Sequence, residues 1–351
     1  MGLPKILIEF KTLAETIITR SERGIVAVIL KDNSNTTENY TYTKESEIVK
    51  SHFTAANLAF LSLVFMGNPS KVIVERVQTE GDLSTALERL ENKQWYYLTV
   101  PVIEVEEINT VVEYITLMRT QYHKTFKAVL PNCAANSEGI INFSTDNIKV
   151  GQKTYTTAEY CARIAGILAG LPLNRSATFY ALTEVESITE SETPDADVDN
   201  GKLILINDGT KIKIARGVNS LTEFTETKGK DFAKIKIVEA VDMIRDDIRT
   251  TFEDGFVGKV ENSYDNKIVF IAAINKYFKD LASRGVLYDK FDNVAEIDIE
   301  GIREWLSKTK DVSGWDEEKV KTANTGTNVF VKANIQIQDA IEDMNFKIYI
   351  N

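Results

Sequence analysis

Strand-like and helix-like patterns alternate along the stretch VIVERVQTEGDLSTALERLENKQWYYLTVPVIEVEEINTVVEYITLMRTQYHKTFKAVLP (Val72–Pro131). Runs of β-branched and aromatic residues predict three strands, and the apolar residues between them recur at helical spacing. Parallel strands need a long crossover connection, which a helix of this length supplies. The stretch therefore predicts a parallel α/β fold.

Further elements extend this pattern in both directions. The segment RGIVAVILK (23–31) predicts a buried strand, and TTAEYCARIAGILAGLPL (156–173) predicts a helix that ends at Pro172. Residues 177–182, ATFYAL, follow as the next predicted strand. Two strand-like runs, KLILIN (202–207) and TKIKIA (210–215), then flank Asp208-Gly209. This dipeptide favours a β-hairpin because both residues tolerate positive φ.

The last third of the chain has a different character. Residues 236–255 and 266–285 predict two amphipathic helices, each closed by a glycine, and residues 298–308 predict a third. Two alternating runs, VFVKANIQIQDA (329–340) and MNFKIYIN (344–351), complete the chain. We therefore expect an α/β and α+β multidomain protein with strand-like ends.

The predicted organisation has five parts. They are an N-terminal arm (1–20), a small N-terminal α/β region (21–90), an α/β middle domain (91–232), a C-terminal α+β domain (233–344) and a C-terminal arm (345–351).

Composition excludes several classes of partner. The formal net charge of -11 repels phosphate backbones and anionic lipid, so no nucleic-acid partner is expected. The longest apolar run, Ala55–Met66, is far shorter than the roughly 20 residues that span a bilayer. The cysteines, Cys133 and Cys161, lack the spacing of a metal site or a disulfide framework. We expect no membrane segment and no metal.

Catalytic patterns are missing from the sequence. It contains no GxGxxG, GxxxxGK[ST] or GxSxG. The two histidines, His52 and His123, have no Ser or Cys nucleophile beside them in the predicted elements. We therefore predict no catalytic residue, no cofactor site and no enzymatic activity.

One helix face carries alternating charges. Asp242, Arg245, Asp246 and Arg249 follow the spacing i, i+3, i+4, i+7, so they share one side of the predicted helix. Each carboxylate has an arginine one turn away. This pattern favours a salt-bridged interface over acid–base chemistry.

The string ARGVNSLT (Ala215–Thr222) follows the predicted hairpin, although no turn or strand rule requires it. It resembles a motif of contractile tail sheath proteins from bacteriophages and phage-tail-like bacteriocins. Residues 236–267 and 272–287 resemble the C-terminal domain of that family in order and spacing. The resemblance covers roughly residues 200–351, and upstream it rests on the strand–helix order and on RSERGIVAVIL (20–30).

The resemblance implies a subtilisin-like middle domain without protease function. It also implies helical rings of subunits around an inner tube, joined by terminal arms that add strands to neighbouring subunits. Contraction would use interface energy stored at assembly and drive the tube through a cell envelope. The implied partners are other copies of the chain, an inner tail tube protein, and baseplate and tail terminator proteins. The implied location is a virion tail or a phage-tail-like particle, assembled in the bacterial cytoplasm.

Three groups of residues are expected to serve this assembly. Both termini alternate apolar and other residues, as strands that join a partner sheet do. The predicted arm residues are Ile6, Ile8, Phe10, Phe346, Ile348 and Ile350. The predicted receiving strand contains Val329, Val331, Ala333, Ile335 and Ile337. In the string ARGVNSLT, Arg216 is expected to anchor the strand exit, Gly217 to permit a bend, and Asn219 and Ser220 to bond the backbone.

Two other classes of function stay open at this point. The parallel sheet is also compatible with an α/β hydrolase-like enzyme, which would need a pocket with convergent polar groups. A baseplate or adhesin component that does not polymerise is the other alternative.

Overall fold

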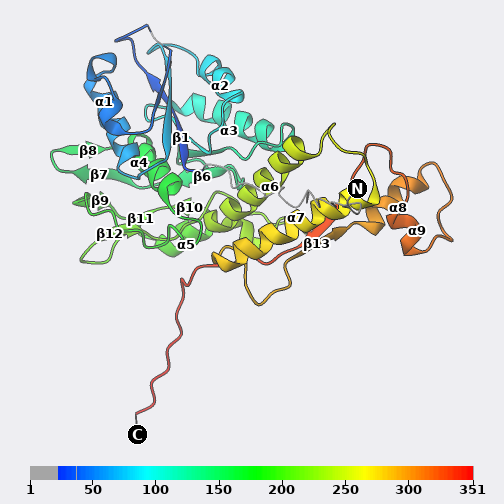
Figure 1. Ribbon diagram of the computed structural model, residues 1–351. Coiled ribbons are helices and arrows are strands. Elements are labelled where there is room, and N and C mark those ends of the chain that lie inside the picture. Colours follow the sequence, from blue (N-terminus) through cyan, green and yellow to red (C-terminus); the bar gives the residue numbers. More distant parts are fainter. Residues whose placement is uncertain (1–22, 37, 351) are drawn as a thin grey trace, which may run out of the picture. The chain divides into compact units, whose positions relative to one another are not determined.

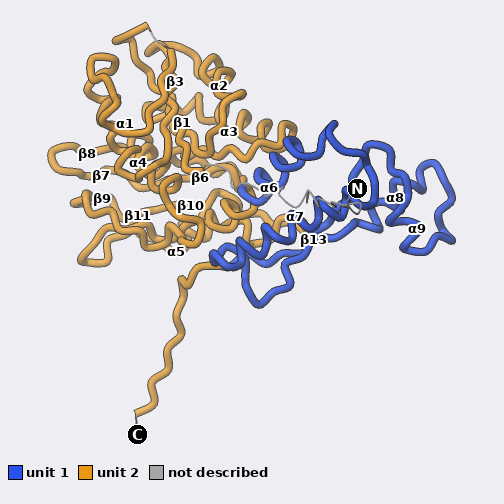
Figure 2. The backbone as a smooth tube through the Cα atoms, viewed as in Figure 1, with its two compact units in different colours: residues 1–21, 243–338 blue, residues 22–242, 339–351 orange. Residues whose placement is uncertain are grey.

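The computed structural model describes residues 23–36 and 38–350. These form two compact units, which Figure 2 shows in different colours. Among the described residues, unit 1 comprises 243–338, and unit 2 comprises 23–242 together with 339–350. The helix α6 (Ile235–Gly255) begins in unit 2 and ends in unit 1.

Within the described residues, unit 2 is built on a seven-stranded sheet (Figure 1). Its strands, from edge to edge, are β10 (Lys202–Leu203), β6 (Ile140–Phe143), β5 (Lys127–Pro131), β4 (Tyr97–Thr99), β1 (Ile25–Lys31), β3 (Lys71–Val77) and β2 (Asn39–Tyr42). Only β2 pairs antiparallel with its neighbour, and the others pair parallel. The predicted parallel α/β sheet is confirmed.

Helices cover both faces of this sheet. The helices α1 (Ala55–Phe65) and α4 (Thr157–Gly170) pack together on one face, and α2 (Ser84–Glu91) and α3 (Val105–Thr120) cover the other. Strand β1 is buried from Ile25 to Leu30 because it has helices on both sides. The α1–α4 contact needs glycine, since a Cβ on Gly166 would lie 2.2 Å from the carbonyl oxygen of Val64.

Smaller elements complete unit 2. They are β7 (Asp146–Val150), β8 (Lys153–Tyr155), β9 (Ser187–Thr189), α5 (Pro194–Asp199), β11 (Leu205–Asn207) and β12 (Ile212–Ile214). The hairpin predicted at Asp208-Gly209 joins β11 to β12, with Gly209 at φ 89°. The strand predicted at 177–182 is wrong. Those residues form turns with one isolated bridge, and Phe179 adopts φ 56° and is 55% exposed.

Unit 1 is the α+β part of the chain. After α6 its elements are α7 (Tyr264–Ser283), β13 (Val294–Ile297), α8 (Ile299–Ser307), α9 (Glu317–Lys321) and β14 (Val331–Asn334). Strands β13 and β14 pair antiparallel, and α7 packs on β13. The predicted C-terminal α+β region is confirmed.

The observed division differs from the predicted domain boundaries. Strands β1 and β3 belong to the same sheet as β4 and β5, so the sheet is continuous across residue 90. The boundary in the second half lies after Asp242, inside α6, instead of at residue 232. No helix in the described part of the chain is long and apolar enough to cross a membrane.

Candidate functional site

A cluster of polar contacts around Glu342 holds residues 339–343 to the rest of unit 2. Ser176 Oγ and Thr178 Oγ1 donate hydrogen bonds to Glu342 Oε1 at 2.6 and 2.7 Å. Arg216 places its Nε 3.6 Å from Glu342 Oε2 and its Nη2 2.5 Å from Asp343 Oδ1. Its guanidinium therefore bridges two consecutive acidic residues of the segment.

A second ion pair lies three residues upstream, between Lys234 and Asp339. This ion pair raises the pKa of Lys234 and, against the effect of burial, lowers the pKa of Asp339. We call Asp339, Glu342 and Asp343 the C-terminal anchor. Sequence reasoning missed this anchor. The available signal was the group of three acids in QDAIEDM (338–344), directly before the terminal strand-like run.

The string ARGVNSLT contributes to the anchor at Arg216 and to the fold at its other polar residues. Asn219 is fully buried and donates from Nδ2 to the carbonyl oxygen of Phe232 at 2.7 Å. Ser220 Oγ donates to the carbonyl oxygen of Ser137 at 2.9 Å. These bonds connect backbone segments that are distant in the sequence.

Close packing favours glycine at position 217, and its predicted role in permitting a bend stays a prediction. Gly217 is not among the glycines with positive φ. A Cβ at this position would instead lie 3.3 Å from both Ala177 Cβ and Ser176 Oγ. The close approach of residues 176–177, which carry part of the Glu342 site, therefore favours glycine.

Arg216→Ala is expected to loosen the C-terminal anchor without unfolding unit 2. The Arg216 and Asp343 side chains are 38% and 81% exposed, so their ion pair contributes about 1 kcal/mol or less. Amide hydrogen exchange of residues 339–343 should become about fivefold faster. Lys211→Ala, which removes an exposed cation from the neighbouring hairpin, is the matched control. Unchanged exchange in Arg216→Ala would contradict this role.

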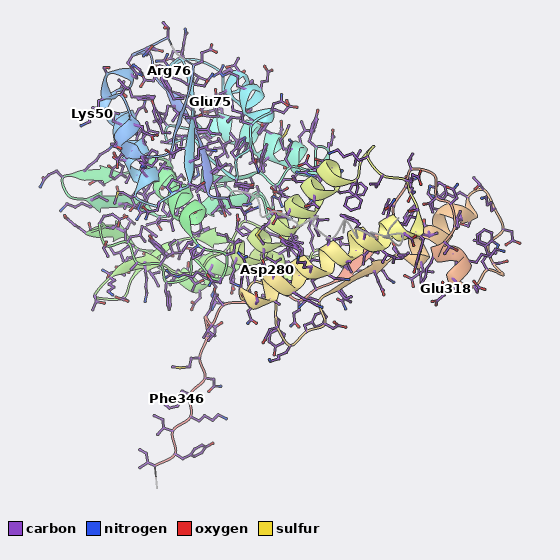
Figure 3. All side chains as sticks on the ribbon, viewed as in Figure 1. Lys50, Glu75, Arg76, Asp280, Glu318 and Phe346 are labelled. Carbon is purple, nitrogen blue, oxygen red and sulfur yellow. The ribbon has the colours of Figure 1, made fainter. Side chains whose placement is uncertain are left out.

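The residues that follow the anchor project as an extended segment, on which Figure 3 labels Phe346. Phe346, Ile348 and Ile350 are 71%, 71% and 95% exposed. No hydrogen bond or ion pair is found between residues 344–350 and the rest of the described chain. A run of exposed apolar side chains on an unpaired backbone is a ready partner for a sheet edge.

The predicted receiving strand is part of unit 1. Of its residues Val329, Val331, Ala333, Ile335 and Ile337, β14 contains Val331 and Ala333. Beyond β14 the chain stays close to residues 286–293: Tyr288 N donates to the Gln336 carbonyl oxygen at 2.8 Å, and Leu287 forms a bridge with Ile337. A two-stranded sheet such as β13–β14 is marginally stable by itself, so an added strand would stabilise it.

The predicted N-terminal arm residues Ile6, Ile8 and Phe10 lie outside the described residues.

A buried charge cluster lies at the amino ends of the parallel strands. Lys127, the first residue of β5, places Nζ 2.9 Å from both Glu239 Oε1 and Asp242 Oδ2 on α6. Arg119 binds both carboxylate oxygens of Asp242, at 3.0 and 3.1 Å. The cluster is completed by Arg23 and by the Tyr97 hydroxyl, both of which bind Glu239.

The position of this cluster argues for a structural role. In open α/β sheets, ligands bind outside the carboxyl ends of the strands, whereas this cluster lies at the opposite end. Each carboxylate already has two or more donors. The cluster therefore fixes the first turns of α6 to the sheet. A lysine inside the apolar run FKAVLP was the sequence signal for it.

The position of Asp242 in this cluster corrects part of the prediction made for the charged helix face. The pairing of Asp242 with an arginine of its own helix is wrong, because its partners come from α3 and β5. Asp246 and Arg249 do pair within the helix, at 3.1 Å, and Arg245 is exposed. An interface role for Arg245, Asp246 and Arg249 stays a prediction.

Acid is expected to destabilise unit 2 through this cluster. Burial alone would raise the pKa of Glu239 and of Asp242, but the nearby cations outweigh it and lower each to about 2. Because the folded-state pKa lies below the unfolded one, the stabilisation is present above about pH 4.5 and lost as the pH falls toward 2. Each carboxylate should contribute on the order of 2–3 kcal/mol.

Urea unfolding followed by circular dichroism, at several pH values between about 7 and 2, measures this loss. The midpoint should fall steeply below about pH 4.5. A midpoint that is the same at pH 3 as at pH 6 would contradict the assignment.

A hydrolase built on this sheet would place its catalytic residues beyond the carboxyl ends of the strands, such as that of β1. Asp32, Ser34 and His52 all lie there, but they form no catalytic chain. Ser34 Oγ donates to the backbone carbonyl oxygen of His52 at 2.9 Å, not to its imidazole. Asp32 accepts from the amides of Ser34 and Thr54 and from Asn57 Nδ2. Despite the burial penalty, these bonds lower the pKa of Asp32 to about 2. The carboxylate therefore fixes a loop.

Two family models match the chain. Residues 77–220 match the phage tail sheath protein central domain, and residues 227–351 match the phage tail sheath C-terminal domain. A tail sheath protein of Clostridium phage phiCD119 is 38% identical over 358 residues, covering 99% of both proteins.

Solved structures share the fold. The sheath tail protein from Desulfitobacterium hafniense gives a TM-score of 0.71 at 15% identity, covering 84% of this chain and 94% of that one. The anti-feeding prophage helical sheath in the contracted state gives a TM-score of 0.73 at 12% identity over 100% of both chains. Together with the two family models and the full-length relative, these matches show that the chain belongs to the phage tail sheath protein family, as a structural subunit of a phage tail or phage-tail-like particle.

Proposed function

We propose that this subunit polymerises as helical rings around an inner tube and contracts to drive that tube through a cell envelope. The observation that carries the proposal is the C-terminal segment, whose exposed apolar residues 346, 348 and 350 follow a well-bonded anchor. An anchored root with a free end is what an arm needs if it is to stay part of one subunit while its tip joins another.

Strand exchange would connect this arm to unit 1 of another copy. Added as a strand, the arm would form about five hydrogen bonds, each worth roughly 0.5–1.5 kcal/mol net. It would bury three apolar side chains, each worth roughly 1.5–3 kcal/mol. Ordering about six residues costs about 1–2 kcal/mol per residue. The two sides nearly balance, so a single arm binds weakly, and stability comes from many arms closing rings together.

The proposed partners follow from this arrangement. They are further copies of the chain, an inner tail tube protein, and baseplate and tail terminator proteins. Structures that share the fold come from a helical sheath in a contracted state and from a baseplate of the anti-feeding prophage, which supports an assembly of this kind. We place assembly in the bacterial cytoplasm, before the particle reaches its target.

We also infer that the subunit has no hydrolytic or nucleotide-dependent activity. The hydroxyl of Ser34 and the carboxylate of Asp32 are both used in backbone contacts, which supports this inference. Contraction would then draw on interface energy stored during assembly, without a chemical fuel.

Negative-stain electron microscopy of the purified full chain tests the proposal. Dilute protein should be largely monomeric, and concentrated protein should form hollow, striated tubes. A protein that stays monomeric at every concentration, and does not add to preformed tubes either, would favour the alternative of a baseplate or adhesin component. Turnover of a peptide or nucleotide, abolished by a point substitution in unit 2, would favour the hydrolase.

A further inference from the structure

Arg76 is a buried charge whose side chain has no ion-pair partner among the described residues. The residue is 6% exposed, its Nη1 is buried without a hydrogen-bond partner, and its side chain forms no ion pair with any described residue. An arginine stays ionised at any physiological pH, and an isolated buried charge is costly. No described residue neutralises this guanidinium, so it is available to an anion from solution.

The neighbouring residue of the same strand, Glu75, is also a buried charge, but it has ion-pair partners. Glu75 is fully buried and binds Arg89 Nε at 2.7 Å and also Lys93. Successive residues of a strand point to opposite faces, so Glu75 and Arg76 cannot pair with each other. Figure 3 labels both residues.

Arg76 lines a pocket of about 630 Å³ in unit 2. The pocket lies outside the carboxyl ends of β1 and β3, because Asp32 and Asn33 follow β1 and Gln78 follows β3. In open α/β sheets this is the edge at which ligands bind.

The N-terminus of α2 opens onto the same pocket through Gly81, Asp82 and Thr85. Its N-cap residue, Leu83, has no side chain that could accept a hydrogen bond from the first turn. Asp82 accepts from the backbone amides of Leu83 and Ser84, the latter at 3.0 Å. The positive end of the helix dipole, which already holds the Asp82 carboxylate, adds to the attraction for an anion in the pocket.

We propose that this pocket binds a small tetrahedral oxyanion of the phosphate class through the guanidinium of Arg76. Arginine presents a planar fork of donors that matches two oxygens of such an anion. The proposal does not depend on the proposed assembly, since every lining residue belongs to one unit of one copy.

The carboxylates that face the pocket set the expected affinity. Asp32 and Asp82 accept hydrogen bonds from backbone amides, and Glu38 Oε2 lies 3.6 Å from Arg89 Nη1. Their negative charge opposes the anion, so we expect millimolar binding that weakens as ionic strength rises.

The test uses the full chain at a dilution where it is monomeric. Sodium phosphate is titrated to about 20 mM at neutral pH, against sodium chloride of equal ionic strength, and thermal unfolding is followed by circular dichroism. Phosphate should raise the Tm by about 2–4 °C. Phosphorus NMR linewidths under the same conditions report binding directly.

Three variants separate anion binding from a structural role. Arg76→Gln should have a Tm no lower than the parent in chloride, because it removes an unpaired buried charge, and it should lose the phosphate effect. Arg76→Lys should retain part of it. Lys50→Gln removes an exposed cation of the same unit, also labelled in Figure 3, and should respond as the parent does.

Several results would overturn the proposal. One is an equal phosphate effect in Arg76→Gln and the parent, and another is no effect in the parent beyond that of chloride. An effect of Arg76→Gln on tube assembly alone, without phosphate binding to the monomer, would also overturn it. If Arg76→Gln does not fold, the linewidth comparison of the parent with Arg76→Lys decides, and equal broadening would refute the role of the guanidinium fork.

Discussion

Removal of residues 345–351 is expected to leave a folded, soluble protein that forms no tubes. The deleted residues include the exposed apolar face of the arm, and none of the anchor residues Asp339, Glu342 and Asp343. The core of unit 2 makes no use of the arm, so its stability should change by less than about 1 kcal/mol. Circular dichroism measures the fold, and negative-stain microscopy of concentrated protein measures assembly.

Substitutions on the two faces of the arm sharpen this experiment. Changing Phe346 and Ile348 together to serine should reproduce the truncation, because both belong to the face predicted to be buried in a partner sheet. Changing Lys347 and Tyr349 together to serine is the matched control and should leave tubes intact. Tubes of normal length from the truncated chain would refute strand exchange by this arm. Loss of the fold would show that the segment belongs to the subunit core.

Lys127→Met is expected to destabilise unit 2 by about 3–5 kcal/mol, the largest effect of any single substitution proposed. Lys127 is fully buried and lies between two carboxylates, so its removal leaves Glu239 and Asp242 facing each other with less compensation. Methionine has a similar volume, which limits the contribution of a cavity. Urea unfolding at neutral pH measures the loss.

Two comparisons distinguish this loss from a general effect of removing a lysine. Lys149→Met breaks an ion pair with Glu186 whose side chains are 49% and 52% exposed, so it should cost less than about 1 kcal/mol. The double variant Lys127→Met with Asp242→Asn should be less destabilised than the sum of its single changes, by about 0.5–3 kcal/mol. Strict additivity would mean that the two side chains do not interact.

Much of the fold could be predicted because it follows local rules. The β-branched run at 25–31, the helical spacing at 105–120 and the dipeptide Asp208-Gly209 each specify their own conformation over a few residues. The failed strand at 177–182 shows the limit of such rules. Its apolar composition fits a strand, but Phe179 takes a positive φ there and its amide donates to the carbonyl oxygen of Ile214.

The family resemblance depended on residues close together in the sequence, so the string at 215–222 and the spacing of the C-terminal helices were sufficient for it. The polar sites were different. Glu342 and Ser176 are 166 residues apart, and Asp242 and Arg119 are 123 apart. No periodicity relates such pairs, and the helical spacing of Asp242 suggested the wrong partner.

By itself, then, the sequence determined the parallel α/β sheet, the C-terminal α+β region and the alternating character of the last residues, because hydrophobic periodicity and turn chemistry act over short distances. Tertiary structure alone decided which charges are paired. It buries Asp242 against Lys127, ties Glu342 to Arg216, and gives the Arg76 side chain no ion-pair partner among the described residues. The physical reason is that the cost of a buried charge depends on the groups that the fold brings within a few ångströms of it, wherever they lie in the chain.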